Sequence, residues 1–231
     1  MWTTPSPVPY AAANSPALGN GWTSATTMAS DGRACLAICV YCGAANDVPH
    51  AYRAVAAQLG DQIARRGHRL VYGGGTVGLM HEVASAAQRA GGTVVGVMPC
   101  GLFDQELLDG PIGELVATDT LRERKAEMDR RADAFVVLPG GLGTLDELIE
   151  VVTLRQLGVH RRPVVVVNVD GYWDPLLAML TRMAVLGFAP TSQGALLDVV
   201  ETPAQAIQRA EQLVDQPSQA PLTPPQGLGD A

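Results

Sequence analysis

The stretch PGGLGTLDE, residues 139 to 147, places Gly140, Gly141 and Gly143 directly before two carboxylates, Asp146 and Glu147. Three glycines in four positions suggest that the main chain turns tightly there or that another group approaches it closely. The stretch follows an apolar run and opens a helical pattern, and the first N–H groups of a helix bind anions readily. The sequence favours a phosphate-binding loop, with a tight turn between a strand and a helix as the alternative.

A second glycine cluster, VYGGGTVGLM (residues 71 to 80), has a similar context and makes Gly74 and Gly75 candidate phosphate contacts. For this cluster taken alone, phosphate binding and a simple turn fit equally well. Neither cluster is followed by Gly-Lys-Ser/Thr, so neither is a P-loop. The second also lacks the acidic residue that ends the next strand in dinucleotide-binding folds. The two clusters together predict a mononucleotide or a sugar phosphate as the ligand.

Glu147 fits two roles. Thr144-Leu145-Asp146-Glu147 matches the capping box, in which a glutamate reaches back to the first amide of its helix, and local sequence alone favours this role. The competing role is catalytic, because the carboxylate would lie beside the proposed phosphate loop. Glu150 lies three residues further, on a neighbouring part of the helix surface. Asp146 suits a helix N-terminus, where negative charge is stabilising.

The segment LRERKAEMDRRA, residues 121 to 132, predicts a helix with cations on an apolar stripe. At 100° per residue, Leu121, Met128 and Ala132 share one face, with Lys125 within it and Arg124 at its edge. Cations on such a face either line a ligand cleft or form ion pairs and extend to solvent, and both interpretations stay open. Three further arginines are expected to be solvated: Arg122, Arg130 and Arg131.

Apolar runs alternate with helical patterns along the middle of the chain. Strands are expected at 34–43, 68–74, 93–99, 134–140 and 163–169, and helices at 51–67, 77–92, 121–132, 144–158 and 173–187, with a last strand–helix pair near 195–214. Continuous Val, Ile and Leu strands that alternate with helices predict an α/β domain with a Rossmann-like, doubly wound parallel sheet and helices on both faces. Ligands of this fold bind beyond the carboxyl ends of the strands, where both glycine clusters fall.

The composition predicts one domain with two flexible ends. The chain has 231 residues, 47% of them hydrophobic, which is ample for a single core. Residues 1–32 and 215–231 are rich in Pro, Ala, Ser and Gly without periodicity, and are expected to be a flexible arm and tail. The ordered domain is expected to span 33–214.

Charge and cysteine usage argue against several classes of protein. A net charge of −7 argues against binding to a nucleic acid polymer. No apolar run is long enough to cross a membrane and no secretion signal is legible, so a cytoplasmic protein is expected. Four cysteines without framework spacing fit a reducing compartment, with Cys39 and Cys42 as a core and a loop residue rather than a redox or zinc pair. The histidines show no metal-ligand spacing, and His81 has no assigned role.

Three of these motifs carry a resemblance to a known family. PGGLGTLDE, RERKAEM (122–128) and VYGGGTVGLM resemble the Lonely Guy (LOG) family of cytokinin riboside 5′-monophosphate phosphoribohydrolases, often labelled lysine decarboxylases. The resemblance covers essentially all of 33–214, including the segment 153–177. It implies hydrolysis of the N-glycosidic bond of a nucleoside 5′-monophosphate to a free base and ribose 5-phosphate. It also implies a homodimer or larger assembly that needs no metal or organic cofactor.

The resemblance assigns roles by position, with Arg124 and Glu147 matching the catalytic pair. The positions that match substrate contacts are Glu106, Lys125, Gly140, Gly141, Leu142, Gly143, Thr144, Asp146 and Thr153. Glu147 would then stabilise the positive charge that develops on the ribose and orient a water, while Arg124 would keep Glu147 ionised.

Two other functions are compatible with the motifs. One is a nucleosidase for AMP or for nucleoside monophosphates in general. The other is a carrier on the same fold that binds a nucleotide without cleaving it. A decarboxylase is disfavoured, because no segment resembles a site for pyridoxal phosphate.

Overall fold

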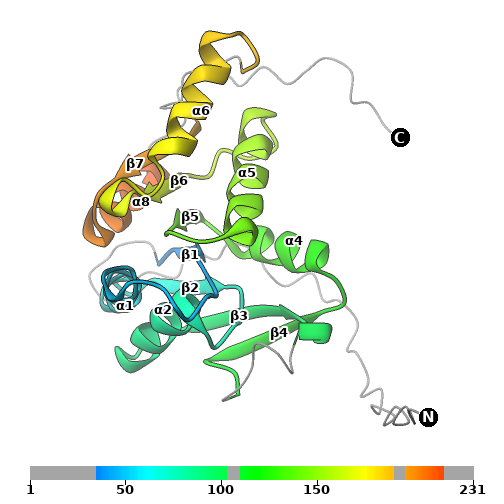
Figure 1. Ribbon diagram of the computed structural model, residues 1–231. Coiled ribbons are helices and arrows are strands. Elements are labelled where there is room, and N and C mark those ends of the chain that lie inside the picture. Colours follow the sequence, from blue (N-terminus) through cyan, green and yellow to red (C-terminus); the bar gives the residue numbers. More distant parts are fainter. Residues whose placement is uncertain (1–34, 103–109, 190–195, 216–231) are drawn as a thin grey trace, which may run out of the picture.

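Parallel strands form one sheet at the centre of the molecule in the computed structural model, which describes residues 35–102, 110–189 and 196–215 (Figure 1). Within these residues the sheet has seven strands in the order β4-β3-β2-β1-β5-β6-β7. The strands are β1 (Ala37–Tyr41), β2 (Arg69–Tyr72), β3 (Val94–Pro99), β4 (Glu114–Thr118), β5 (Ala134–Val137), β6 (Val164–Val167) and β7 (Asp198–Val200). Every neighbouring pair is parallel, which confirms the doubly wound α/β fold.

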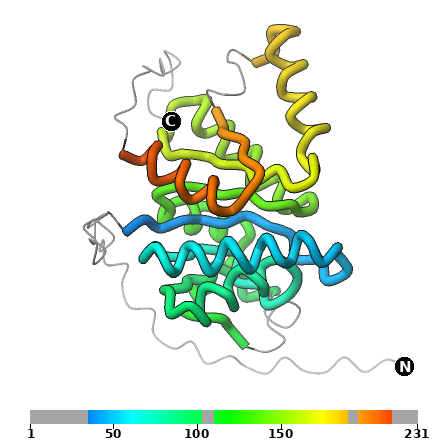
Figure 2. Tube along the Cα trace, turned by 90° about the vertical axis from the view of Figure 1, so that its left-hand side faces the viewer, coloured from blue at the N-terminus to red at the C-terminus, as the bar shows by residue number. Residues whose placement is uncertain are grey.

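Helices cover both faces of this sheet. They are α1 (His50–Arg65), α2 (Gly78–Arg89), α4 (Leu121–Arg131), α5 (Leu142–Gln156), α6 (Asp174–Val185) and α8 (Pro203–Asp215), with short 3-10 turns η1 (Cys100–Leu102) and η2 (Val169–Gly171). Figure 2 shows α1, α2 and α8 side by side over one face. The opposite face packs against α4 and α5 (Figure 1).

The two faces bury separate apolar clusters because successive side chains of a strand point to opposite sides. Ile38 and Val40 of β1 pack beneath α1 and α2, while Cys39 packs with Met128 of α4 and Leu148 of α5. The central strands are buried along their whole length, as expected for a sheet covered on both faces.

Strand order reverses between β1 and β5, which are neighbours in the sheet but far apart in the chain. From β1 the chain winds outward to β4 on one side, and from β5 to β7 on the other. The two loops that follow β1 and β5 therefore diverge and leave a crevice between them, the usual ligand position in such sheets.

The fold differs from expectation at one edge. β4 was not predicted, because its sequence ELVAT is short and its residues are partly exposed, so it lacks the continuous apolar run of the inner strands. The expected strand–helix pair near 195–214 is present as β7 and α8. The expected arm, 1–32, and the expected tail from residue 216 onward lie outside the described residues; Asp215, expected to be the first residue of the tail, is the last residue of α8. In the part of the chain that is described, no helix is both long and apolar enough to cross a membrane.

Candidate active site

A cavity of about 630 Å³ lies at the carboxyl ends of β1 and β5, where the strand order reverses. The loops after β1 and β5 line it from one side, with the start of α5 between them. The lining residues are Cys42 to Ala45, Val48, Pro49, Tyr52, Gly73, Leu79, Met80, Met98, Pro99, Leu102, Leu121, Arg124, Pro139 to Gly141, Gly143, Thr144, Glu147 and Tyr172. Its size suits a ligand as large as a nucleotide.

The glycine loop after β5 presents a row of unused N–H groups at one end of this cavity. Helix α5 begins at Leu142 with Gly141 as its N-cap, and no side chain caps it. The first helical bond runs from the Leu145 N–H to the Gly141 carbonyl, 3.0 Å. Among the described residues no acceptor faces the N–H groups of positions 140 to 144. Such a row at a helix N-terminus is suited to bind an anion.

The capping-box interpretation of Glu147 is wrong. Because α5 begins two residues before Thr144, that threonine is the third residue of the helix and not its cap. Glu147 lies more than one turn into the helix and forms its hydrogen bond with Arg124 instead. Its carboxylate is therefore available to the cavity that it lines.

The second glycine cluster does not form a comparable anion site. At the start of α2, the Gly78 N–H donates to Asn46 Oδ1 (3.0 Å) and the Leu79 N–H to the Gly43 carbonyl (2.9 Å). Gly74 and Gly75 do not line the cavity, whereas Gly73, which was not a predicted site residue, does. A Cβ on Gly73 would lie 1.9 Å from Arg124 Nη2, so glycine is needed here to admit a guanidinium.

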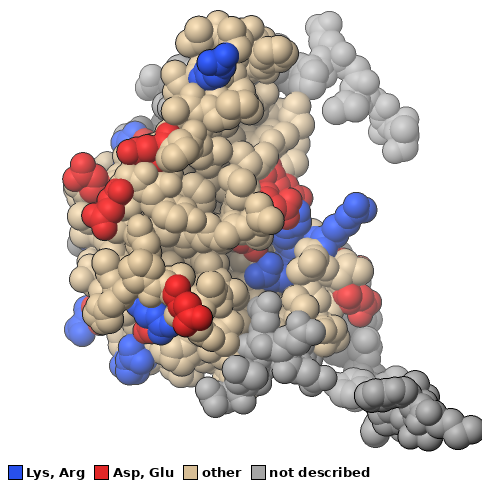
Figure 3. Space-filling view, viewed as in Figure 1, with Lys and Arg blue, Asp and Glu red and all other residues tan. Residues whose placement is uncertain are grey.

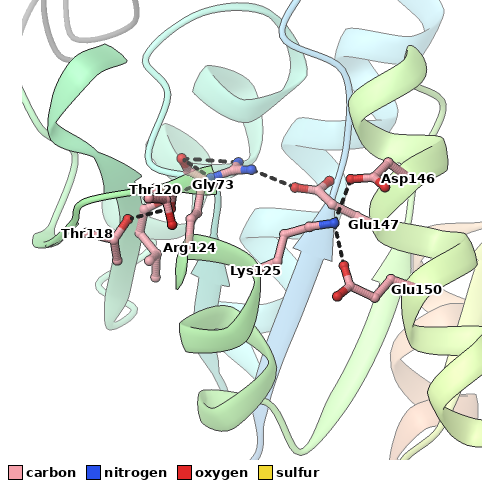
Figure 4. A network of polar contacts seen from close by, with 9 residues as sticks. Gly73, Thr118, Thr120, Arg124, Lys125, Asp146, Glu147 and Glu150 are labelled. Carbon is pink, nitrogen blue, oxygen red and sulfur yellow. Dashed lines mark hydrogen bonds and ion pairs between the residues drawn. The ribbon is translucent and has the colours of Figure 1, made fainter. Parts of the chain in front are cut away.

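Arg124 is held in place from three sides (Figure 4). Side chains cap the start of its helix: the Thr120 hydroxyl accepts from the Glu123 N–H (3.1 Å), and the Glu123 carboxylate accepts from the N–H of Asp119, the residue before the cap (2.9 Å). Arg124 Nε then donates to the Val97 carbonyl (3.1 Å), and Nη2 to the Gly73 carbonyl (3.3 Å). Its side chain is 14% exposed, so the guanidinium is fixed before any ligand arrives.

Glu147 faces Arg124 across the floor of the cavity. Arg124 Nη1 donates to Glu147 Oε1 at 2.8 Å, and the glutamate side chain is only 7% exposed. Burial raises the pKa of the Glu147 carboxyl above its ordinary value, and the charge of Arg124 opposes that rise. The outcome is a buried acidic group whose protonation state depends on its arginine, an arrangement typical of catalytic sites.

Lys125, Asp146 and Glu150 form an ion-pair cluster outside the cavity. Lys125 Nζ contacts Asp146 Oδ2 at 2.8 Å and Glu150 Oε2 at 2.5 Å (Figure 4). Figure 3 shows the acidic and basic side chains meeting between α4 and α5. These hydrogen bonds raise the pKa of Lys125, with Asp146 as the larger cause. Lys125 and Asp146 were predicted to contact substrate; neither lines the cavity, and here they join the helices that carry Arg124 and Glu147.

The other predicted residues are spread around this centre. Gly140, Gly141, Gly143 and Thr144 line the cavity; Leu142 points outward with 85% of its surface exposed. Thr153 is exposed three turns along α5, away from the cavity. Glu106 lies outside the described residues.

Arg131, Cys39, Cys42 and His81 lie around or behind this centre. Arg131 is not solvated: it is mostly buried and forms an ion pair with the buried Glu127. Cys39 and Cys42 are both buried, and Cys42 lines the cavity. His81 Nε2 lies 3.3 Å from the Ser85 hydroxyl. Among the described residues, no group of three His, Cys, Asp or Glu side chains is arranged to hold a metal ion.

Sequence reasoning missed the apolar half of the cavity. Its wall is built from side chains on five separate segments: Met80, Met98, Pro99, Leu102, Leu121, Val48 and Tyr52. Leu121 was assigned to the core stripe, but it is 56% exposed and turned to the cavity. Apolar residues of this kind carry no local signal, because a core residue and a pocket residue look alike in sequence.

Comparisons with known proteins agree with this geometry. A family described as "Possible lysine decarboxylase" matches residues 80–210. The cytokinin riboside 5′-monophosphate phosphoribohydrolase LOG of Oryza sativa subsp. japonica is 43% identical over 177 residues, which are 77% of this chain and 73% of that protein. LOG7 of Arabidopsis thaliana, which has the same activity in its name, is 48% identical over 151 residues, 65% of this chain and 70% of its own. This chain is a member of the LOG family.

A solved structure places the LOG fold in a wider group. The molybdenum cofactor carrier protein of Chlamydomonas reinhardtii matches 78% of this LOG-family chain and 99% of its own, with a TM-score of 0.61 and 25% sequence identity. The shared fold thus serves proteins named for different functions, so the function of the LOG-family chain has to be argued from its site.

Proposed function

We propose that this protein hydrolyses the N-glycosidic bond of cytokinin riboside 5′-monophosphates, such as isopentenyladenosine monophosphate, to the free base and ribose 5-phosphate. The observation that carries the proposal is the Arg124–Glu147 pair on the floor of a cavity that ends in a row of free N–H groups. The names of relatives at 41–48% identity support the same reaction.

The glycine loop binds the 5′-phosphate in this scheme. The N–H groups of Gly141, Gly143 and Thr144 donate to its oxygens, and the dipole of α5 favours the negative charge. Glu147 lies one turn further along the same helix, so a phosphate on the first turn brings its ribose toward the carboxylate. Binding energy from the phosphate thereby orients the reacting carbon.

The reaction breaks the bond between C1′ and the base nitrogen, whose electron pair leaves with the base. Positive charge develops on the ribose, and the ionised Glu147 stabilises it. A water that donates a hydrogen bond to Glu147 attacks C1′; its oxygen forms the new bond, and its proton passes through the carboxylate to the departing base. Arg124 keeps Glu147 ionised, because a neighbouring positive charge favours the carboxylate form.

The apolar half of the cavity supports a base that carries a hydrocarbon substituent. Met80, Met98, Pro99, Leu102 and Leu121 line it, and none of these side chains ends in a polar group. An isopentenyl group buried there gains about 0.8 kcal/mol per CH2.

The proposed function is tested by supplying isopentenyladenosine monophosphate and AMP separately and measuring free base and ribose 5-phosphate by chromatography. Release of isopentenyladenine at the higher kcat/KM supports the proposal. Preferential release of adenine indicates an AMP nucleosidase. Binding of both nucleotides without release of base indicates a carrier and contradicts the proposal.

Gly141→Ala is expected to weaken nucleotide binding without weakening the fold. A Cβ at this position meets nothing within 4 Å, and the backbone φ of −87° is ordinary for alanine. The new methyl group instead occupies space beside the N–H groups that bind the phosphate. We expect KM to rise about tenfold or more, as for the loss of hydrogen bonds to a charged group, with the melting temperature unchanged. An unchanged KM would mean that the phosphate binds elsewhere.

We also propose that the protein is a homodimer. Helix α6 extends outward from the sheet (Figure 1); Leu176, Leu177 and Leu180 pack partly against the core, but none of its residues is fully buried, although the helix is largely apolar. Exposed apolar side chains on it and nearby include Leu157, Val159, Met179, Val185, Leu186 and Phe188. A large exposed apolar surface usually marks an interface.

Light scattering of the wild type is expected to give twice the chain mass of 24.2 kDa. The double variant with Val185→Asp and Phe188→Asp is expected to give the mass of a single chain. A monomeric wild type would contradict the dimer.

A cytoplasmic location is proposed as well. All four cysteines are free thiols, including the exposed Cys100, which fits a reducing compartment. Cell fractionation tests it, and recovery from a secreted or oxidising fraction would refute it.

A further inference from the structure

Tyr172 contacts the glycine loop from a segment that has no role in the proposed mechanism. It follows η2, at the end of β6, and its hydroxyl donates to the Gly140 carbonyl at 2.6 Å. The two residues are 32 positions apart in the chain. Tyr172 also lines the cavity.

The loop that carries Tyr172 is shaped by its own side chains. Asn168 Oδ1 accepts from the Trp173 N–H (2.8 Å), and its Nδ2 donates to Asp174 Oδ1 (2.7 Å). Asp170 has a φ of 50°, and it is the one non-glycine residue with positive φ in the ranges that the structure describes. Such a conformation costs about 1–3 kcal/mol, and strain of this kind clusters at functional sites. The loop is built to hold its residues in one arrangement.

Aromatic neighbours fix the ring of Tyr172. The ring packs edge-on against Tyr52 of α1, with centroids 5.8 Å apart, and against Trp173 at 5.0 Å. Trp173 is itself buried in the core. A ring held on two sides delivers its hydroxyl to a defined point, which is the Gly140 carbonyl.

This hydrogen bond gives the Gly140 carbonyl a partner outside the helix. With Gly141 as the N-cap, the first helical bond of α5 runs to the Gly141 carbonyl, and the Gly140 carbonyl would accept from the Thr144 N–H only if the helix began one residue earlier, a bond that is not formed. The carbonyl of Gly140 and the N–H of Gly141 belong to one trans peptide plane and point in opposite directions. Fixing the carbonyl therefore also fixes the Gly141 N–H.

We propose that Tyr172 is a positioning residue that locks the Gly140–Gly141 peptide plane and so keeps two donors, the N–H groups of Gly141 and Thr144, open for the substrate phosphate. The inference rests on the proposed phosphate site at α5. Without the hydroxyl, the Gly140 carbonyl turns toward the Thr144 N–H and closes that donor. The same rotation moves the Gly141 N–H away from the phosphate and brings a carbonyl oxygen closer to it.

The test compares Tyr172→Phe with a matched control, Tyr72→Phe. Tyr72 also donates its hydroxyl to a main-chain carbonyl, that of Ile112 at 3.5 Å, but does not line the cavity. For Tyr172→Phe we expect the Kd for AMP and the KM for the nucleotide substrate to rise about tenfold to hundredfold, the range for losing hydrogen bonds to a charged group. Affinity for adenosine, which lacks the phosphate, should change little. The control should match the wild type in each.

Amide spectra of the ligand-free protein separate positioning from direct contact. In Tyr172→Phe the amide resonances of Gly141 and Thr144 should shift before any ligand is added, because the peptide plane has turned. Weaker AMP binding with unshifted amides would overturn the inference, as would a variant that binds AMP like the wild type. AMP binding by a wild type that releases no base would remove the proposed hydrolysis alone, whereas a wild type that does not bind AMP would overturn both.

Discussion

Glu147→Gln is expected to lower kcat by about 10²- to 10⁴-fold, the usual contribution of a group that moves a proton in the transition state. Glutamine has the shape of glutamate and keeps an oxygen for the 2.8 Å hydrogen bond from Arg124. It has no charge with which to stabilise a cationic ribose and no basic oxygen to accept a proton from water. KM should change much less, because the proposed phosphate loop is untouched.

The stability of Glu147→Gln provides a second, independent readout. Burial raises the pKa of Glu147 in the folded protein, so the folded state binds this proton more tightly than the unfolded state does. The protonated carboxyl of Glu147 therefore stabilises the folded state at low pH, and this contribution is lost as the pH rises through the pKa of the group. Glutamine does not ionise, so the melting temperature of the variant should be no lower than that of the wild type at neutral pH. Any excess of the variant's melting temperature over the wild type's should become smaller in acid.

Glu150→Gln is the matched control, since Glu150 lies on the same helix but pairs with Lys125 outside the cavity. Its effect on kcat should be under about tenfold, in line with the small worth of exposed ion pairs. Turnover by Glu147→Gln at the wild-type rate would remove Glu147 from the chemistry.

Arg124→Met is expected to reduce kcat/KM by a similarly large factor, about 10²-fold or more, because a misplaced catalytic group loses most of its effect. The guanidinium holds Glu147 and is itself fixed by the carbonyls of Gly73 and Val97. Methionine fills much of the space but supplies no donor and no charge. Arg122→Met, on an exposed part of the same helix, is the control and should behave like the wild type.

The pH profile of Arg124→Met is the sharper measurement. The proposed mechanism needs ionised Glu147, so activity should fall as the pH drops through the raised pKa of that carboxyl. Arg124 opposes the rise, and removing its charge raises the pKa further. The acid limb of kcat/KM should therefore move to higher pH, and Arg124→Lys, which keeps the charge, should move it less. An acid limb in the wild-type position would show that Arg124 does not control the ionisation of Glu147.

The fold was predictable because local sequence patterns mark most of its strands and helices. Runs such as VVVV in β6 and AFVV in β5 are buried on both faces, and each is followed by a helical pattern. Strand β4 was not predicted, because a strand at the edge of the sheet does not require a continuous apolar run. The order reversal that creates the crevice followed from the fold class and not from any single residue.

Site residues were predictable only where they lie in a recognisable sequence motif. Arg124 and Glu147 were singled out, and the structure brings them together, but the interpretation of Glu147 from local sequence favoured a cap. Side-chain capping occurs instead at Thr120, whose hydroxyl accepts from the Glu123 N–H at the start of the helix that carries Arg124. Tyr172 was missed because its hydroxyl bonds to a residue 32 positions away, a relation that no local spacing reveals.

A crystal structure of Glu147→Gln with AMP tests the central claim most directly. The account predicts the phosphate on the N–H groups at the start of α5, and C1′ of the ribose within about 3–4 Å of the side chain at position 147, the separation of reacting groups in a productive complex. A nucleotide bound in another part of the protein, or one whose C1′ lies far from that side chain, would contradict the account.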